Sequence, residues 1–291
     1  MARGLPETDL RRAGRITPAP DPASAPYDQL AQFAELWHAR DWPSAAELSA
    51  ALGGLTHPVS GAPLHFVAQT QDLLGDRLHF EQRIAERGAI ALREGTWHDL
   101  YSALMWLRYP RLKLALNQLQ VADLPLQGRG NRTRRQQSLT HVDEAGVLVA
   151  SECPALLGAI DAHDWQTLFV QRRADFGARI TVHVFGHALF ELGHNAHVTL
   201  AGKALLVEVP EGFVARPLAE RAALLDHAVA EAVSAGTLGA DPAAMPSLPL
   251  SGIPGWFGRD ADPGFIASAE CFRPRPPHRA YDPPLRLARL A

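Results

Sequence analysis

The spacing of apolar residues predicts helices along the first third of the chain. Helical spacing begins at Tyr27 in YDQLAQFAELWHARDW, and PSAAELSAAL over 43–52 predicts a second helix that a Gly-Gly pair ends. A third helical pattern runs roughly over 75–94, after turn residues and short extended pieces at 57–66. Residues 1–26 have no periodicity, and we expect them to form a flexible N-terminal tail.

The sequence TWHDLYSALMWLRYP marks the start of the next helix. Thr96 is a favourable N-cap residue, and Asp99 stands three positions later, as in an Asp version of the capping box. Apolar residues then follow at helical spacing, and Pro110 is expected to end or kink the helix near Tyr109. His98 is therefore expected in the first turn of a helix.

Strand-like and helical patterns alternate in the second half. SLTHVDEAGVLVAS predicts a β-hairpin over 138–150, because two β-prone runs flank the turn residues Asp-Glu-Ala-Gly. Alternation of β-branched residues predicts a strand over 179–186, and KALLVEVP predicts another over 203–209. RPLAERAALLDHAVAEAVSAG predicts an amphipathic helix, and the Pro-, Gly- and Trp-rich C-terminal part predicts ordered loops.

These elements indicate a single α+β domain over residues 27–291. We expect a helical N-terminal half packed on a small, mostly antiparallel sheet built from 138–150, 179–186 and 203–209. Irregular loops rich in proline and tryptophan are expected to close the fold at its C-terminal end.

Composition excludes several classes of protein. The formal net charge is -3 and 20% of residues are charged, so no global basic field favours nucleic acid. Two distant cysteines without a CxxC motif favour a reduced compartment. The N-terminus lacks the apolar core of a signal peptide, and no apolar run is long enough for a membrane span. We therefore expect a cytoplasmic protein with no nucleic-acid or membrane partner.

Several phrases together resemble one known family. HDLYSALMWLRYP followed by LN, then RTRRQQSLTHVDEAG, VFGHALFE and GIPGW, is similar to the bacterial DUF3025 family over roughly residues 30–275. The function of that family is unassigned, so the resemblance implies no catalytic residues. Positions 141 and 183 are usually apolar in the family pattern, whereas this chain has His141 and His183. That departure argues against an essential role for these two histidines.

His98 is the first candidate for chemistry. The positive end of the helix dipole favours a neutral imidazole, which would suit a general base or a metal ligand. The alternative is a partly buried histidine bonded to a backbone carbonyl, and a capping role explains Asp99. Tyr101 shares the helix face of His98 and is a candidate substrate contact.

A second candidate lies in RITVHVFGHALFELGHNAH. His183, His187 and Glu191 are spaced by four, which places them on one face of a strand or a helix. A zinc-protease motif would need glutamate where Val184 stands, so its general base is absent. His187 and Glu191 lie inside the FGHALFE phrase and are the preferred divalent-metal ligands or acid–base pair, the alternative being ordinary solvated or structural residues.

Charged and aromatic residues elsewhere suggest substrate contacts. Arg132, Arg134 and Arg135 in NRTRRQ could hold a phosphate or carboxylate, although a solvated loop would look the same. Trp256 in GIPGW either walls a pocket or covers the core. Turn chemistry explains the Asp143-Glu144 pair at the tip of the expected hairpin.

Two functions are consistent with these residues. The first is a hydrolase, metal-assisted or not, that acts on a small phosphorylated or carboxylated substrate, with His98 as general base. The second is a non-catalytic anion- or partner-binding protein whose histidines are structural. The first requires His98 and His187 to share a pocket, and the second does not. The sequence leaves the substrate and the oligomeric state open.

Overall fold

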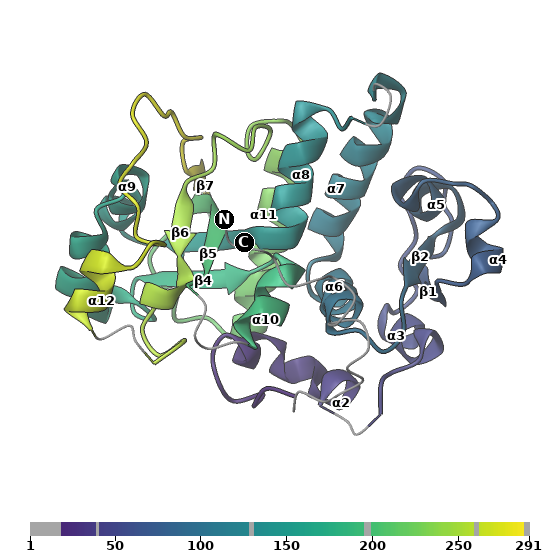
Figure 1. Cartoon of the computed structure of the whole chain (residues 1–291), viewed down its shortest axis with the longest axis horizontal. Helices are drawn as coiled ribbons and strands as arrows, with labels where there is room; N and C mark the ends of the chain where they lie inside the picture. The colour runs from purple at the N-terminus through teal and green to yellow at the C-terminus, as the bar shows by residue number, and fades with distance from the viewer. Residues whose placement is uncertain (1–18, 39–40, 128–130, 195–198, 259–261, 288–291) are drawn as a thin grey trace, which may run out of the picture. The chain divides into compact units, whose positions relative to one another are not determined.

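The computed structural model describes residues 19–38, 41–127, 131–194, 199–258 and 262–287 (Figure 1). The chain divides into two compact units, residues 1–104 and 105–291. Most of the expected flexible tail, residues 1–18, lies outside the described residues, and turns occupy much of 19–26. No helix in the described part of the chain is long and apolar enough to cross a membrane.

The first unit contains a two-stranded parallel sheet and short helices. Its strands pair from His65↔Ala89 to Ala68↔Leu92. The elements are η1 (Tyr27–Phe33), α2 (Ala34–Trp37), α3 (Ala45–Ala51), β1 (His65–Ala68), α4 (Gln71–Leu74), α5 (Phe80–Arg87) and β2 (Ala89–Leu92).

The prediction of one helix over 75–94 is wrong in its second part. Helix α5 ends at Arg87 there, and strand β2 begins at Ala89. Gly88 ends α5 in the left-handed conformation, with φ 68°. A Cβ atom at this position would lie 2.0 Å from the carbonyl oxygen of Pro63, so the turn requires glycine. All four residues of β2 are buried, and a short, fully apolar run such as AIAL cannot be distinguished from a buried helix by periodicity.

The expected helix start at Thr96 is confirmed in α6 (Trp97–Arg108). The Thr96 hydroxyl accepts a hydrogen bond from the backbone N–H of Asp99 at 3.3 Å. The Asp99 carboxylate accepts hydrogen bonds from the backbone and guanidinium of Arg93, which lies before the helix. The following helix begins at Pro110, so the break near Tyr109 is also confirmed.

A mixed five-stranded sheet forms the centre of the second unit. Its order is β4–β3–β5–β6, with β7 paired to β5. The strands β3–β4 and β5–β6 are antiparallel, whereas β3–β5 and β5–β7 are parallel. The α+β class is therefore confirmed, but the sheet is mixed rather than mostly antiparallel. The strands are β3 (Gly146–Ser151), β4 (Ile180–Val184), β5 (Ala201–Glu208), β6 (Ser247–Pro249) and β7 (Leu285–Arg286).

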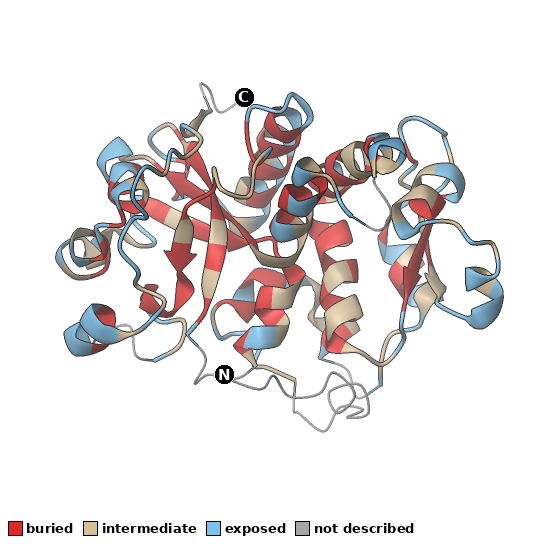
Figure 2. Ribbon diagram, turned by 45° about the horizontal axis from the view of Figure 1, so that its top comes forward, coloured by how far each residue is buried: buried red, intermediate tan, exposed pale blue. Residues whose placement is uncertain are grey.

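Helices cover this sheet, and Figure 2 shows buried strands with exposed helix faces outside them. Asp226 of α11 accepts hydrogen bonds from the backbone N–H groups of Arg111 and Leu112, at the start of α7. The helical segments are α7 (Pro110–Ala122), η2 (Leu124–Leu126), α8 (Arg134–Ala145), α9 (Pro154–Ala162), η3 (Gln166–Gln171), η4 (Arg173–Asp175), α10 (His187–Gly193), α11 (Leu218–Ser234), η5 (Leu250–Gly252) and α12 (Pro263–Ser268).

The hairpin expected over 138–150 is wrong. Helix α8 occupies 134–145 and passes directly into β3. A capping box starts this helix, because the Thr133 hydroxyl accepts from the backbone of Gln136 and the Gln136 side chain accepts from the backbone of Thr133. The supposed turn Asp-Glu-Ala-Gly is consequently the end of a helix followed by the first residue of a strand.

A close backbone contact joins this helix-to-strand junction to the start of α10. The N–H groups of Phe185 and Gly186 both donate to the carbonyl oxygen of Gly146, at 3.1 and 2.8 Å. A Cβ atom on Gly186 would lie 2.5 Å from the Cα of Ala145, which is closer than real Cβ atoms come. Glycine at position 186 therefore allows the two junctions to touch, and the contact places His187 next to the end of α8.

We expect G186A to lower the free energy of unfolding by about 2–3 kcal/mol or more, because backbone atoms cannot move aside as a flexible side chain can. G158A is the matched control, since a Cβ atom at this α9 position meets nothing within 4 Å. It should leave stability unchanged or raise it by about 0.5–1 kcal/mol. Urea denaturation of the full chain measures both, and equal stability of the two variants would refute the close contact.

Candidate functional site

His187 is the first residue of α10 and is almost fully buried, with 4% of its side chain exposed. Its Nε2 atom lies 3.4 Å from Oε2 of Glu144, and its Nδ1 atom lies 3.9 Å from Oδ2 of Asp143. Both carboxylates belong to the last turn of α8, which the contact at Gly186 brings to this position. Each ring nitrogen of His187 therefore faces a different carboxylate.

A buried lysine supports the Asp143 carboxylate. Nζ of Lys113, on α7, lies 2.5 Å from Oδ1 of Asp143 and 5.3 Å from the centre of the Trp106 ring. This ion pair compensates the negative charge of Asp143 and fixes one of its oxygens, so that the other is held on the side of His187. A well-packed ion pair of this kind restricts the orientation of a carboxylate more than it adds stability.

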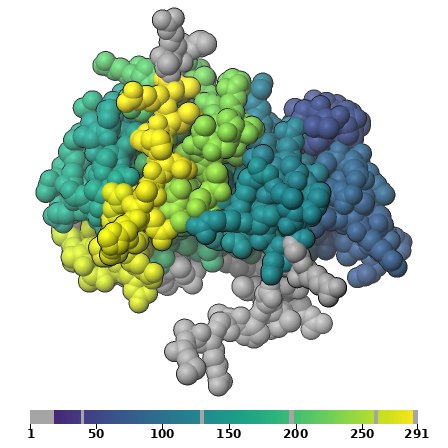
Figure 3. All heavy atoms as spheres, turned by 90° about the horizontal axis from the view of Figure 1, so that it is seen from above, coloured from purple at the N-terminus to yellow at the C-terminus, as the bar shows by residue number. Residues whose placement is uncertain are grey.

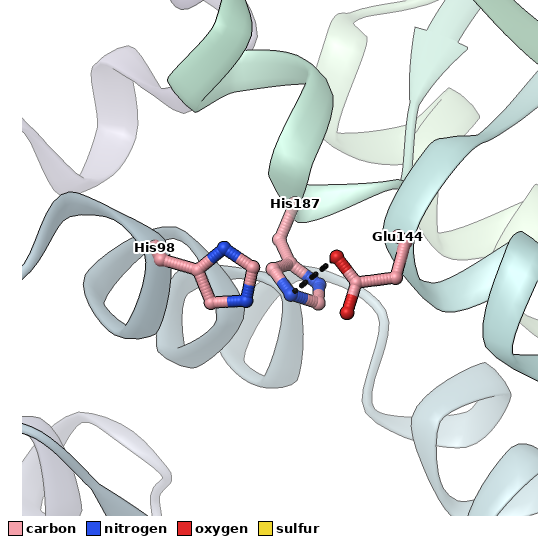
Figure 4. Close-up of side chains that lie close together, drawn as sticks. All are labelled: His98, Glu144 and His187. Carbon is pink, nitrogen blue, oxygen red and sulfur yellow. Dashed lines mark ion pairs between the residues drawn. The ribbon is translucent and has the colours of Figure 1, made fainter. Parts of the chain in front are cut away.

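Figure 4 shows the Glu144 carboxylate directed at the imidazole of His187, and the dashed line marks the ion pair between them. Imidazole nitrogens and carboxylate oxygens are common ligands of zinc and of iron(II) in enzymes. Glu144 is half-buried, whereas His187 is buried. His98 lies in the first turn of α6, within the first unit.

The carboxylate beside His187 differs from the one expected from the sequence. Glu191 lies one helical turn after His187 in α10, but it is Glu144 of α8 whose Oε2 lies 3.4 Å from Nε2 of His187. Reading 138–150 as a hairpin concealed Glu144, because it placed this residue at an exposed turn. The Thr133-x-x-Gln136 capping signal could have predicted the helix and its last turn.

The two aromatic residues expected to contact substrate have different surroundings. Tyr101 is completely buried and stacks on Trp97, with 5.5 Å between the ring centres. It belongs to the core of the first unit and is not placed to contact a substrate there. Trp256 is half-buried and meets Phe257 edge to face at 6.3 Å.

Two of the three arginines of the expected anion clamp are already paired. Arg134 lies 2.8 Å from Asp241, and Arg135 forms an ion pair with the buried carboxylate of Asp123. The hydrogen bond from Arg135 is the main reason why the pKa of Asp123 lies below its usual value. Arg132 is exposed. Arg134 and Arg135 therefore tie the start of α8 to acidic residues of the second unit.

The two histidines that depart from the family pattern lie apart from this site. His141 is exposed on α8. His183 is completely buried in β4, and its Nδ1 lies 3.5 Å from the hydroxyl of Tyr109, which accepts a hydrogen bond from Arg108. Burial lowers the pKa of His183 well below its usual value, and the charges of Arg108 and Arg221 lower it further. His183 is consequently a neutral histidine of the core.

Comparison with known proteins gives one match. The model of a family described as "Protein of unknown function (DUF3025)" matches residues 64–276, a span that contains His98, Glu144 and His187. No curated protein and no solved structure matches the chain.

His183 should make the stability of the protein sensitive to acid. Below about pH 6.5 the unfolded chain protonates this histidine, whereas the folded chain does not, so stability falls as the pH decreases. Between pH 7.5 and 5.5 we expect the free energy of unfolding of the wild type to fall by about 1.4 kcal/mol more than that of H183L. Urea denaturation at the two pH values measures the difference, and identical losses would contradict a neutral buried histidine.

Proposed function

We propose that this chain, which belongs to the DUF3025 family, is a metal-dependent hydrolase whose divalent ion is held by His187 and Glu144. The observation that carries the proposal is the close pairing of the His187 imidazole with the Glu144 carboxylate (Figure 4), with a second carboxylate, that of Asp143, on the other side of the ring. A site with few protein ligands leaves coordination positions for water, which is the arrangement of catalytic rather than structural zinc sites.

The exposure of the ligands supports a site that is open to a substrate. His187 is covered, whereas 40% of the Glu144 side chain is exposed, so an ion bound between them would have protein on one side and solvent on the other. A bound zinc ion lowers the pKa of its water to about 7 and polarises a carbonyl or phosphoryl oxygen. Hydrolysis of an ester, amide or phosphate ester is the reaction class that this arrangement supports best.

Asp143 is assigned to orient His187 from outside the ligand set. With Nε2 directed at Glu144, the opposite nitrogen of His187 is directed at the carboxylate held by Lys113. A carboxylate in this position fixes the tautomer of a metal-binding histidine and increases its basicity. The separation of 3.9 Å is longer than a hydrogen bond, and metal binding would draw the ring and the carboxylate together.

The proposal predicts that the purified full chain, freed of metal with a chelator, binds one equivalent of zinc. E144Q and H187A should weaken binding by more than about 100-fold, since each removes a ligand. A histidine–glutamate pair on the surface supplies matched controls, because His227 and Glu231 lie 3.5 Å apart and are both exposed. Isothermal titration calorimetry should show wild-type binding for H227A and E231Q. Equal affinities for the site variants and the controls would contradict the metal site.

The role of Asp143 gives a graded prediction. D143N should retain the metal but weaken zinc binding by about 10–100-fold, because the side chain acts through His187 and not on the ion. Unchanged affinity would remove Asp143 from the site. A loss as large as that of E144Q would make it a ligand.

Catalysis is tested with chromogenic substrates. The metal-loaded chain should hydrolyse at least one of p-nitrophenyl acetate, p-nitrophenyl phosphate and bis(p-nitrophenyl) phosphate, and a chelator should abolish the activity. E144Q should lose this activity, whereas E231Q should retain it. Zinc binding without hydrolysis of any of the three substrates would instead favour a non-catalytic metal-binding protein.

A further inference from the structure

A cavity in the larger unit shares no lining residue with the histidine–carboxylate group. Its volume is about 510 Å³, which is within the range of small-molecule sites. The C-terminal segment, yellow in Figure 3, runs along the surface of this unit and supplies part of the wall. The lining includes His163, Lys203, Met245, Glu270, Arg273, Arg279 and Tyr281.

One wall of this cavity is fixed by a neutral histidine. Nδ1 of His163 lies 3.0 Å from the carbonyl oxygen of Arg273, which can only accept, so this nitrogen carries the proton. Nε2 therefore accepts from the hydroxyl of Tyr281 at 2.9 Å, and the two rings stack with 3° between their planes. Burial is the main reason why the pKa of His163 lies below its usual value. Trp165 also donates to the Arg273 carbonyl, at 2.8 Å.

The lining carries an excess of positive charge. Three cations, Lys203, Arg273 and Arg279, accompany one acid, Glu270, which leaves a charge of +2 (three minus one) while His163 is neutral. Within the described residues, no carboxylate lies at ion-pair distance from Lys203 or Arg279. Lys203 reaches the carbonyl of Pro242 at 3.4 Å, and Arg279 donates to the carbonyl of Ala243 at 3.1 Å.

The surroundings of Lys203 and Arg279 favour the binding of an anion. Burial and the nearby charge of Arg279 lower the pKa of the Lys203 ammonium, and both cations line the same cavity. Asp241 is close enough for the charge of Arg279 to lower its pKa, but its hydrogen bonds are made with Arg134 and the backbone of Ala243. An incoming anion would relieve the repulsion between Lys203 and Arg279.

We infer that this cavity binds a small phosphorylated molecule, with the phosphate between Lys203 and Arg279 and the organic part towards Met245 and the Tyr281 wall. A dianionic phosphate matches the charge of the lining, whereas a monocarboxylate would neutralise half of it. Arginine supplies paired donors and lysine supplies a point charge, which is a common combination around phosphate groups.

The test uses phenyl phosphate, inorganic phosphate and benzoate as probes, with the metal-free full chain at pH 7.5. Isothermal titration calorimetry should show one equivalent of phenyl phosphate bound, more weakly bound inorganic phosphate, and benzoate at least tenfold weaker than phenyl phosphate. K203M and R279Q should each weaken phenyl phosphate binding at least tenfold. R286Q, which changes a strongly exposed arginine of β7, should bind like the wild type.

Circular dichroism and thermal unfolding show whether each variant is folded. If K203M does not fold, R279Q by itself tests the site. Failure of the wild type to bind phenyl phosphate at 10 mM, or wild-type binding by a folded R279Q, would overturn the inference. Benzoate bound as tightly as phenyl phosphate would overturn the assignment to a phosphate. E144Q should keep this binding, so that failure of the metal site and failure of the anion site remain distinguishable.

Discussion

The close contact of two backbone junctions is the constraint on which the candidate metal site depends. Helix α8 passes into β3 at Gly146, and β4 passes into α10 at Gly186, and the two glycines meet through hydrogen bonds to one carbonyl oxygen. The contact leaves no space for a Cβ atom on Gly186. Since His187 follows Gly186 directly and Glu144 lies in the last turn of α8, this contact also sets the separation of the two side chains.

The charged residues around this contact are held in place by neighbouring helices. Lys113 reaches Asp143 from α7, and α7 is held to α11 by the hydrogen bonds of its first N–H groups to Asp226. Burial raises the pKa of Asp226 to about 6, despite these backbone donors. Rigid helices thus hold the acidic residues near His187, which is the arrangement that functional sites require for defined geometry.

Local signals predicted much of the fold, and nonlocal pairing limited the rest. The Thr96 cap, the break at Pro110 and the strand of KALLVEVP were visible in the sequence because each depends on neighbouring residues. The mixed strand order was not visible, because β3 and β5 pair across the intervening α9, β4 and α10. The same limit applied to the site. Spacing within one helix favoured Glu191 as the partner of His187, whereas the observed partner, Glu144, comes from another helix.

The central claim is that His187 and Glu144 bind one metal ion, and X-ray absorption at the zinc edge tests it most directly. The spectrum of the zinc-loaded full chain should show a first shell of nitrogen and oxygen at about 2.0–2.1 Å, with the multiple scattering of imidazole and no sulfur. In E144Q this pattern should disappear at equal total zinc, while E231Q should preserve it. A shell that contains cysteine sulfur at about 2.3 Å, or one without imidazole, would contradict the account.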